Sequence, residues 1–249
     1  MFKMALKSFF LLLGLKISKV PKLEETLSSG FAFKGVNTWD WLKKYKIGTV
    51  IDIGANEGQF AKKILSVLPM AEIHCFEPLK EVYGHLKSNF KMHKNVLVYN
   101  FGLGAANEEL KIFNNEYSPS SSMLEMLDLH KANFDFAREV EEKLISVRRL
   151  NDFFPNHFPN PVLLKIDVQG YEIKVLEGGE EVVRQADIIF IETTFKPLYK
   201  DQPLFREIYT WLEARGFVYA GNIEQLFSPI DNEILQADAI FVNETKLLK

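Results

Sequence analysis

Cysteine, long apolar runs and an excess of basic residues are scarce or absent in this sequence, and each absence excludes a class of protein. Cys75 is the only cysteine among 249 residues, so the chain has no intrachain disulfide and no cysteine-based zinc cluster. We expect Cys75 to be buried and inert in a strand. The formal net charge of −3 argues against a general nucleic-acid binder, which usually carries a strong basic excess. No two of the five histidines have the His-x-x-x-His spacing of a helical metal site.

The longest basic and apolar segment lies at the N-terminus. The first 22 residues hold five lysines and no acidic residue around a short apolar run at residues 9–15. That run is far shorter than the ~20 residues that span a bilayer. Three alternatives stay open: a helix packed on the domain or on a partner, an interfacial helix on an anionic membrane, or a signal-like segment without a small-residue cleavage site. We predict a helical extension over residues 1–48 and a cytoplasmic location, with peripheral membrane contact through residues 1–22 as the alternative.

The stretch at residues 49–60 predicts a buried strand, a tight turn and a helix. Val and Ile dominate residues 50–53, and this run is too short and too β-branched for a helix. Gly54 and Gly58 allow the backbone to turn sharply and to approach a ligand closely. The helix that follows directs its free amide groups back at this turn, which favours an anion there. The pattern therefore predicts a site for a nucleotide-like cofactor, although a plain strand-to-helix turn is the alternative.

The spacing of the motif indicates which cofactor fits. Dinucleotide sites carry Gly-x-Gly-x-x-Gly, whereas this chain has Asp-x-Gly-x-x-x-Gly from Asp52 to Gly58. A carboxylate at Asp52 would repel a pyrophosphate but could accept a hydrogen bond from an ammonium group. S-adenosylmethionine carries both an ammonium group and a carboxylate on its methionine arm, and it is therefore the cofactor we predict.

A second acid supports a nucleoside-containing cofactor. Glu77 lies 25 residues after Asp52, a distance that fits one strand-helix-strand step. An acid at the end of the second strand binds ribose hydroxyls in doubly wound folds. Pro78 has no amide hydrogen and ends the strand there.

Three motifs together resemble a known family, the FkbM-type methyltransferases. They are residues 52–58, 76–78 and 163–172, with further matches at residues 175–179 and 191–192. The third motif is the most specific, and the resemblance extends over roughly residues 49–242. It implies a class I methyltransferase fold that uses S-adenosylmethionine to methylate oxygen, often on sugars or natural products. It also implies that Gly102 lies near the adenine and that Ser121 or Ser122 contributes to the cofactor pocket.

The order of the expected elements predicts an α/β fold with a doubly wound, mostly parallel sheet, because parallel neighbours need crossover helices. The last two strands, at residues 217–220 and 239–242, have no obvious helix between them, so we predict an antiparallel hairpin. We predict helices at residues 56–68 and 171–184, and a helical charge pattern within residues 138–143. The methyltransferase domain is expected over residues 49–249, with a capping insertion at about 114–143.

Acids end several apolar strands, and in an open parallel sheet ligands bind at those ends. Lys165 and Asp167 are two residues apart on one strand and therefore share a face. We expect Asp167 or Glu172 to act as the base for an acceptor hydroxyl, with Lys165 balancing the charge and Glu192 on the same side. An ion pair that only orders the turn is the alternative. Three acids could also hold a divalent metal, but none is predicted.

The predicted site therefore has two parts. The catalytic candidates are Asp167, Glu172, Lys165 and Glu192. The cofactor-binding candidates are Asp52, Gly54, Asn56, Gly58, Phe60, Glu77, Pro78, Gly102, Ser121 and Ser122. The predicted reaction is O-methylation of a sugar, glycan or natural-product acceptor, with no nucleic-acid partner and an open oligomeric state. The alternatives are an NAD-dependent oxidoreductase, disfavoured by the missing third glycine, and a non-catalytic binding protein, disfavoured by the retained acids.

Overall fold

The computed structural model describes residues 39–115, 122–124, 127, 140–154 and 158–247. The chain divides into two compact units, Met1–Asp40 and Trp41–Lys249, and the description below concerns the second. The expectations for residues 1–22, for Ser121 and for most of the capping insertion lie outside the described residues. Within the described ranges, no helix combines the length and the apolar character needed to cross a bilayer.

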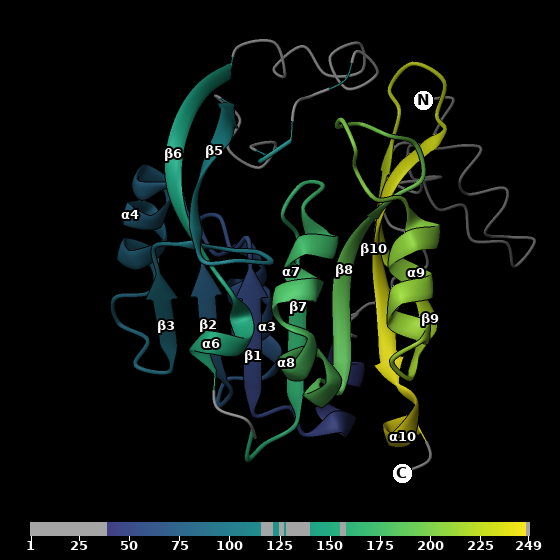
Figure 1. The fold of residues 1–249 in the computed structure, drawn as a ribbon. Coiled ribbons are helices and arrows are strands. Elements are labelled where there is room, and N and C mark those ends of the chain that lie inside the picture. The colour runs from purple at the N-terminus through teal and green to yellow at the C-terminus, as the bar shows by residue number, and fades with distance from the viewer. Residues whose placement is uncertain (1–38, 116–121, 125–126, 128–139, 155–157, 248–249) are drawn as a thin grey trace, which may run out of the picture. The chain divides into compact units, whose positions relative to one another are not determined.

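A seven-stranded sheet forms the centre of this unit (Figure 1). Its order is β3-β2-β1-β7-β8-β10-β9. Strand β10 is antiparallel to both of its neighbours, and the other pairs are parallel. The strands are β1 (Thr49–Ile53), β2 (Glu72–Phe76), β3 (Val96–Tyr99), β7 (Val162–Ile166), β8 (Ile188–Thr194), β9 (Phe217–Phe227) and β10 (Ile234–Asn243). This arrangement confirms the predicted Rossmann-like, class I methyltransferase fold and its C-terminal antiparallel hairpin.

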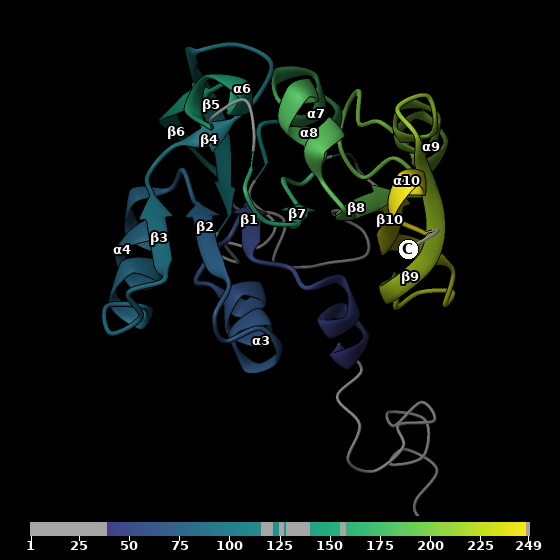
Figure 2. The ribbon, with the colours of Figure 1, turned by 90° about the horizontal axis from the view of Figure 1, so that it is seen from below.

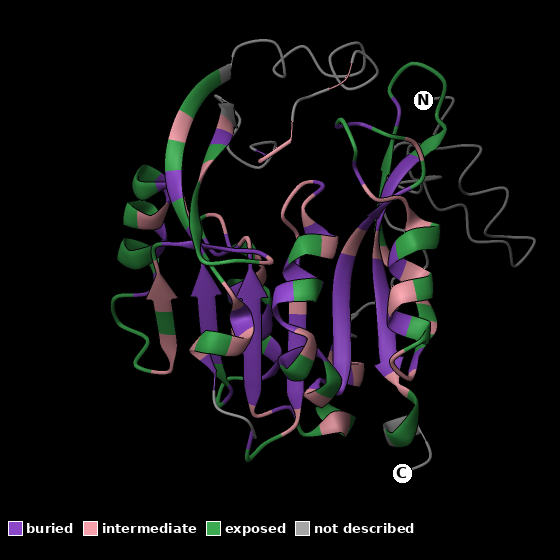
Figure 3. Ribbon diagram, viewed as in Figure 1, coloured by how far each residue is buried: buried purple, intermediate pink, exposed green. Residues whose placement is uncertain are grey.

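The strand order reverses between β1 and β7, and both strands lie in the core. All five residues of β1 are buried, and so are four of the five in β7 (Figure 3). Their apolar side chains explain this, since a parallel sheet is covered on both faces. Cys75 in β2 is free and buried, as predicted. In open α/β sheets such a reversal opens a crevice at the carboxyl ends of the strands, where ligands bind.

Helices cover both faces of the sheet (Figure 2). On one face lie α3 (Gln59–Val67), α4 (Lys80–Asn89) and the 3-10 helix η1 (Asp40–Tyr45). The Trp41 ring of η1 contacts the Phe190 ring of β8 with a 6.0 Å centroid separation. On the other face lie α6 (Leu150–Phe153), α7 (Glu172–Gly178), α8 (Glu180–Gln185) and α9 (Phe205–Glu213), and the short α10 (Glu244–Leu247) follows β10.

A second, three-stranded sheet corrects the helical interpretation of residues 138–143 for its described part, residues 140–143. Strand β6 (Val140–Arg148) pairs with β5 (Glu108–Asn115) and β4 (Gly102–Leu103) in the order β4-β6-β5. Ile145 and Val147 are buried and alternate with exposed residues, and they pack with Leu79 and Val82. This period-two burial is typical of a strand. Glu141 and Glu142, which precede it in β6, are both exposed, so both faces of the strand meet solvent there.

Two predicted helices have different bounds from those expected. Helix α3 begins at Gln59 rather than at residue 56, because Gly54, Asn56 and Gly58 all adopt a positive φ that no right-handed helix contains. The predicted helix at residues 171–184 is two helices, α7 and α8, which meet at Gly179. The side-chain oxygen of Asn151 accepts hydrogen bonds from the amides of Glu181 and Val182 in the first turn of α8 and so caps that helix.

The turn after β1 requires glycine at residue 54 for reasons of packing. Gly54 has φ +74°, and a Cβ atom there would lie 1.8 Å from the carbonyl oxygen of Asp167. The close approach therefore joins the end of β1 to the end of β7.

Replacing Gly54 by alanine should destabilise the fold. We expect Gly54→Ala to lower the free energy of unfolding by more than ~1 kcal/mol, because it adds both a steric clash and an unfavourable φ. Gly84→Ala is the matched control: Gly84 lies in α4 with open space around its Cα, so this change should stabilise by ~0.5–1 kcal/mol. Urea denaturation measures both. Equal effects of the two substitutions would contradict the account.

Candidate active site

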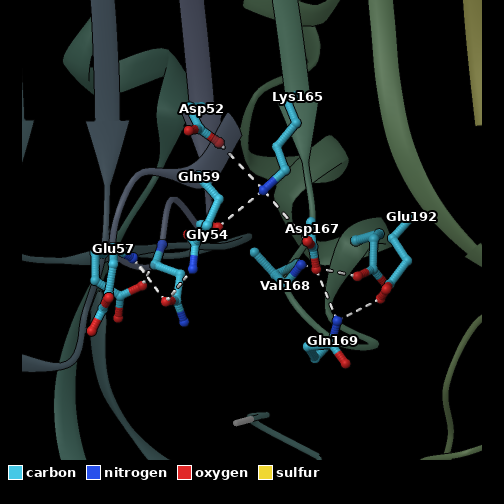
Figure 4. Close-up of polar contacts among 12 residues, drawn as sticks. Asp52, Gly54, Glu57, Gln59, Lys165, Asp167, Val168, Gln169 and Glu192 are labelled. Carbon is cyan, nitrogen blue, oxygen red and sulfur yellow. Dashed lines mark hydrogen bonds and ion pairs between the residues drawn. The ribbon is translucent and has the colours of Figure 1, made fainter. Parts of the chain in front are cut away.

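A buried ion pair joins β1 to β7 at the carboxyl end of the sheet. Asp52 and Lys165 are partners in the strand register, and Nζ of Lys165 lies 3.3 Å from Oδ1 of Asp52. The same ammonium donates a hydrogen bond to the carbonyl oxygen of Gly54 at 3.0 Å and lies 3.4 Å from Oδ2 of Asp167. Figure 4 shows Lys165 between these three groups. Lys165 therefore connects the glycine turn with the motif that follows β7.

The protonation of this pair follows from its burial and its charges. The Asp52 side chain is fully buried, and burial raises the pKa of its carboxyl group, although Lys165 opposes the rise. Burial by itself lowers the pKa of Lys165, but the neighbouring carboxylates, Asp52 first, outweigh it and raise that pKa above its ordinary value. Lys165 is therefore cationic at neutral pH. Among the described residues, none forms a hydrogen bond with either carboxylate oxygen of Asp52.

Glu77 closes the turn from the end of β2. Its Oε2 accepts a hydrogen bond from the amide of Asn56 at 3.1 Å, and its Oε1 accepts one from the amide of Leu79 at 2.9 Å. A carboxylate oxygen can accept two hydrogen bonds, so each oxygen keeps one acceptor position. Burial raises the pKa of Glu77 to about 7 in spite of these amides.

A second cluster forms after β7 around Gln169, which the sequence analysis did not single out. Its Nε2 donates to Oδ1 of Asp167 at 2.9 Å and to Oε2 of Glu192 at 2.8 Å (Figure 4). Its Oε1 accepts a hydrogen bond from the hydroxyl of the buried Tyr199 at 3.0 Å. The side chain of Gln169 therefore holds two carboxylates side by side. Its place in the third motif, between Asp167 and Glu172, is the sequence feature that could have identified Gln169.

The charges around Glu192 favour its neutral form. Burial raises its pKa well above the ordinary value, and the charges of Asp167, Glu172 and Asp238 raise it further. Asp238 is the register partner of Glu192 on β10, and burial raises its own pKa to about 6. Sequence reasoning missed Asp238 because it lies in the middle of a strand, where an isolated acid has no motif around it.

Glu172 forms its hydrogen bonds within the turn that follows β7. It is buried, and its Oε1 accepts hydrogen bonds from the amides of Val168 and Gly170 at 3.2 and 3.0 Å. Its pKa rises to about 7, mainly through burial. These contacts hold the left-handed turn at Gln169 and Gly170 in place. Glu172 therefore stabilises the turn beside the carboxylate cluster.

Ser122, which pairs with Phe113 of β5, contacts the same turn. It is buried, its hydroxyl donates to the carbonyl oxygen of Gln169 at 2.5 Å, and it accepts from the amide of Leu124 at 2.9 Å. Asn100, which the sequence analysis did not single out, donates to the carbonyl oxygens of Glu77 and Pro78 at 3.0 Å each. It follows the end of β3, so the rule that located the acids could also have located this amide.

Two further cofactor candidates differ in their place. A Cβ atom on Gly102 would meet the side chains of Met123, Ile145 and Val147, so Gly102 lies apart from these clusters, within the small sheet's packing. Phe60 lies beside the ion pair, because Nζ of Lys165 is 5.9 Å from the centre of its ring, and it packs edge-to-face on Phe190 at 6.0 Å. Within the described residues, no group of three or more His, Cys, Asp or Glu side chains could hold a metal ion.

Fold and site together define a class, the S-adenosylmethionine-dependent methyltransferases. The methyltransferase FkbM domain matches residues 52–219 of this chain. The chain therefore belongs to the FkbM methyltransferase family, and its cofactor is S-adenosylmethionine. The buried oxygens of Asp52 without hydrogen bonds and the remaining acceptor positions of Glu77 fit a ligand that carries ammonium and hydroxyl donors.

Characterised relatives are methyltransferases too. The 2-O-methyltransferase NoeI of Sinorhizobium fredii is 25% identical over 173 residues, which cover 66% of this chain and 71% of NoeI. Methyltransferase 1 of Beauveria bassiana is 27% identical over 185 residues, 69% of this chain and 72% of that protein. Among solved structures, magnesium protoporphyrin IX methyltransferase from Synechocystis, with bound cofactor, is 11% identical with a TM-score of 0.45 over 82% of this chain and 74% of that one.

The buried ion pair yields a stability prediction. Lys165→Met leaves the buried Asp52 carboxylate without its cation, so we expect it to lower the free energy of unfolding by ~3–5 kcal/mol. Lys111→Met is the matched control, because Lys111 pairs with Glu142 on the surface, where an ion pair adds little. Denaturant unfolding at pH 7 measures both. Equal effects for the two variants would show that Lys165 is not the partner on which Asp52 depends.

Glu77 yields a prediction for pH dependence. The folded state raises the pKa of Glu77 from 4.5 to about 7, so the folded protein binds this proton more tightly than the unfolded chain does. Its contribution to stability is therefore present below about pH 4.5 and is lost as the pH rises to about 7. Glu77→Gln should flatten the fall in unfolding free energy across this window.

Exposed Glu109 provides the control for this measurement. Glu109→Gln should leave the slope of unfolding free energy against pH as it is in the parent protein. An unchanged slope in Glu77→Gln, with two-state unfolding throughout, would contradict the assignment of this proton to Glu77.

Proposed function

We propose that the protein transfers a methyl group from S-adenosylmethionine to a hydroxyl of a sugar, glycan or natural-product acceptor. In this proposal the cofactor lies against the turn after β1 and the end of β2, and the acceptor hydroxyl faces Asp167. The proposed cofactor contacts at these strand ends are Asp52, Gly54, Asn56, Gly58, Glu77 and Pro78. Further proposed contacts are Phe60, Gly102, Ser121 and Ser122.

The proposal depends most on the accessible, fixed carboxylate of Asp167. Among the acids of this cluster, its side chain keeps 34% of its surface accessible, whereas that of Asp52 keeps none. Oδ1 is held by Gln169 and Oδ2 faces Lys165. A base must reach the proton that it removes and must be held in one orientation, and Asp167 meets both requirements.

The other two acids are less suited to this task. The Oε1 atom of Glu172 accepts two backbone amides inside the turn, and the residue is buried. Burial and the surrounding negative charges raise the pKa of Glu192, so it favours the protonated form, which cannot accept a proton. We therefore assign the proton transfer to Asp167 and positioning roles to Glu172 and Glu192.

The bonding changes are simple. When bound, S-adenosylmethionine supplies an electrophilic methyl group on a sulfonium and leaves as S-adenosylhomocysteine. The acceptor oxygen forms the new bond to carbon, and its proton passes to the carboxylate of Asp167. Lys165 lies 3.4 Å from that carboxylate and keeps it in place through the change of charge. An alcohol is a weak nucleophile at neutral pH, so this proton removal raises the rate.

The activity of one relative supports oxygen as the acceptor atom. NoeI, which is 25% identical to this chain, is a 2-O-methyltransferase. The stability of the product identifies the type of atom that was methylated. A methyl ether survives mild alkali, a methyl ester is hydrolysed to methanol, and an N-methyl amine survives alkali and still takes up a proton in acid.

Replacing the proposed base tests the function. The protein is incubated with methyl-labelled S-adenosylmethionine and a cell extract, and alkali-stable label is counted. Asp167→Asn should reduce the rate of transfer by ~10²–10⁴-fold, the usual contribution of a general base, while calorimetry shows cofactor affinity close to that of the parent. Asp231→Asn, in the exposed loop between β9 and β10, is the matched control and should transfer at the parent rate.

Two results would contradict the proposal. Full activity of Asp167→Asn would remove Asp167 from the reaction. Label that is released as methanol by alkali, or that is found only on nitrogen, would rule out transfer to a hydroxyl.

A further inference from the structure

A cavity of about 600 Å³ lies between α7 and α9, beside the turn that follows β7. This volume is within the range of small-molecule sites. Carbon-rich surfaces line much of it, from Leu124, Ile173, Pro203 and Trp211. Of these four, only Leu124 takes part in the site described above, through its backbone amide.

Three of the polar side chains that line this cavity are already engaged with the protein, and Asp201 and Tyr171 line it as well. Lys174 pairs with Glu177 at 2.9 Å, and the carboxylate of Glu207 accepts the amide of Leu204 at 2.6 Å. The hydroxyl of Thr210 donates to the carbonyl oxygen of Arg206 at 2.8 Å. A ligand that fills the cavity therefore gains more from apolar burial than from new hydrogen bonds.

The indole of Trp211 is fixed in this wall. The guanidinium of Arg215 lies 3.5 Å from the centre of its ring and also donates to the carbonyl oxygen of Trp211 at 2.9 Å. A rigid aromatic wall costs little conformational entropy when a ligand binds. Trp211 therefore offers a preformed surface for a flat or hydrocarbon group.

The cavity lies within reach of the proposed base. Gly170 lines it and follows Asp167 by three residues, so the two lie at most ~11 Å apart along the chain. Gly170 is packed by Leu124 and Tyr199, and the hydroxyl of Tyr199 is bonded to the amide that holds Asp167. The turn that carries Asp167 therefore also forms part of the cavity wall.

We propose that this cavity binds the apolar part of the methyl acceptor. The acceptor is an amphiphilic alcohol with an aromatic or hydrocarbon group within ~10 Å of its hydroxyl, rather than a free, fully polar sugar. This inference rests on the proposed function, since it names the class of substrate for the same site. The energy of apolar burial beside the reacting group fixes the position of the hydroxyl.

Filling the cavity tests the inference without touching the proposed base. The probes are 2-naphthol, a compact aromatic alcohol, and methyl α-glucopyranoside, a polar alcohol of similar size. Binding of each is titrated by ligand-observed NMR to the full chain saturated with S-adenosylhomocysteine. Thr210→Trp narrows the cavity from an exposed position of α9, and Trp211→Ala removes the aromatic wall.

Ser146→Trp is the matched control. Ser146 is also exposed and lines a different cavity of about 460 Å³ beside Arg148 and Asp152. We expect Thr210→Trp and Trp211→Ala each to weaken the binding of 2-naphthol by about tenfold or more. Ser146→Trp should leave this affinity within about twofold of the parent value. Thr210→Ser, which keeps the cavity open, should bind like the parent.

The outcomes separate this inference from the proposed function. Three results would overturn the inference. The parent could fail to bind 2-naphthol, or all variants could bind it equally. The glucoside could also bind more tightly than 2-naphthol and lose affinity in Thr210→Trp. Calorimetry with S-adenosylmethionine should give the same cofactor affinity for these variants as for the parent protein. Absence of cofactor binding in the parent would instead remove the proposed function while leaving the cavity result intact.

Discussion

The ion pair between Asp52 and Lys165 is the interaction on which the rest of the site depends. It joins the two strands at which the sheet reverses its order, and it is buried where an unpaired charge would be costly. The same ammonium binds the carbonyl oxygen of Gly54 and faces Asp167. A single cation therefore fixes the glycine turn, where the cofactor is proposed to lie, against the carboxylate proposed as base.

Gln169 extends this arrangement toward the acceptor side. Its amide holds Asp167 and Glu192 together, and the turn that presents it is tied by Glu172, Ser122 and Tyr199. Buried polar networks of this kind are stabilising only when their members are satisfied. Asp52 lies outside this network and is held by its ion pair with Lys165. None of the described residues forms a regular hydrogen bond with its oxygens, so a donor on a ligand would add to the ion pair.

Much of this could be predicted because it follows from strand ends. The carboxyl ends of parallel strands meet at one edge of the sheet, so Asp52, Glu77, Asp167 and Glu192 could be placed near one another without coordinates. The role of Gln169 could not, since it depends on a left-handed turn whose backbone no side-chain pattern specifies. Asp238 enters through the register of β10 with β8, a long-range pairing. The strand at residues 140–148 was misread at its start because its charged residues fit helical and strand spacing equally well.

A crystal structure with bound S-adenosylhomocysteine tests the central claim most directly. The account predicts that the ribose hydroxyls bind the carboxylate of Glu77 and that the methionine arm lies beside Asp52 and the turn at Gly54, with the sulfur directed toward Asp167. A ligand bound elsewhere, or one bound here with its sulfur directed away from Asp167, would contradict it.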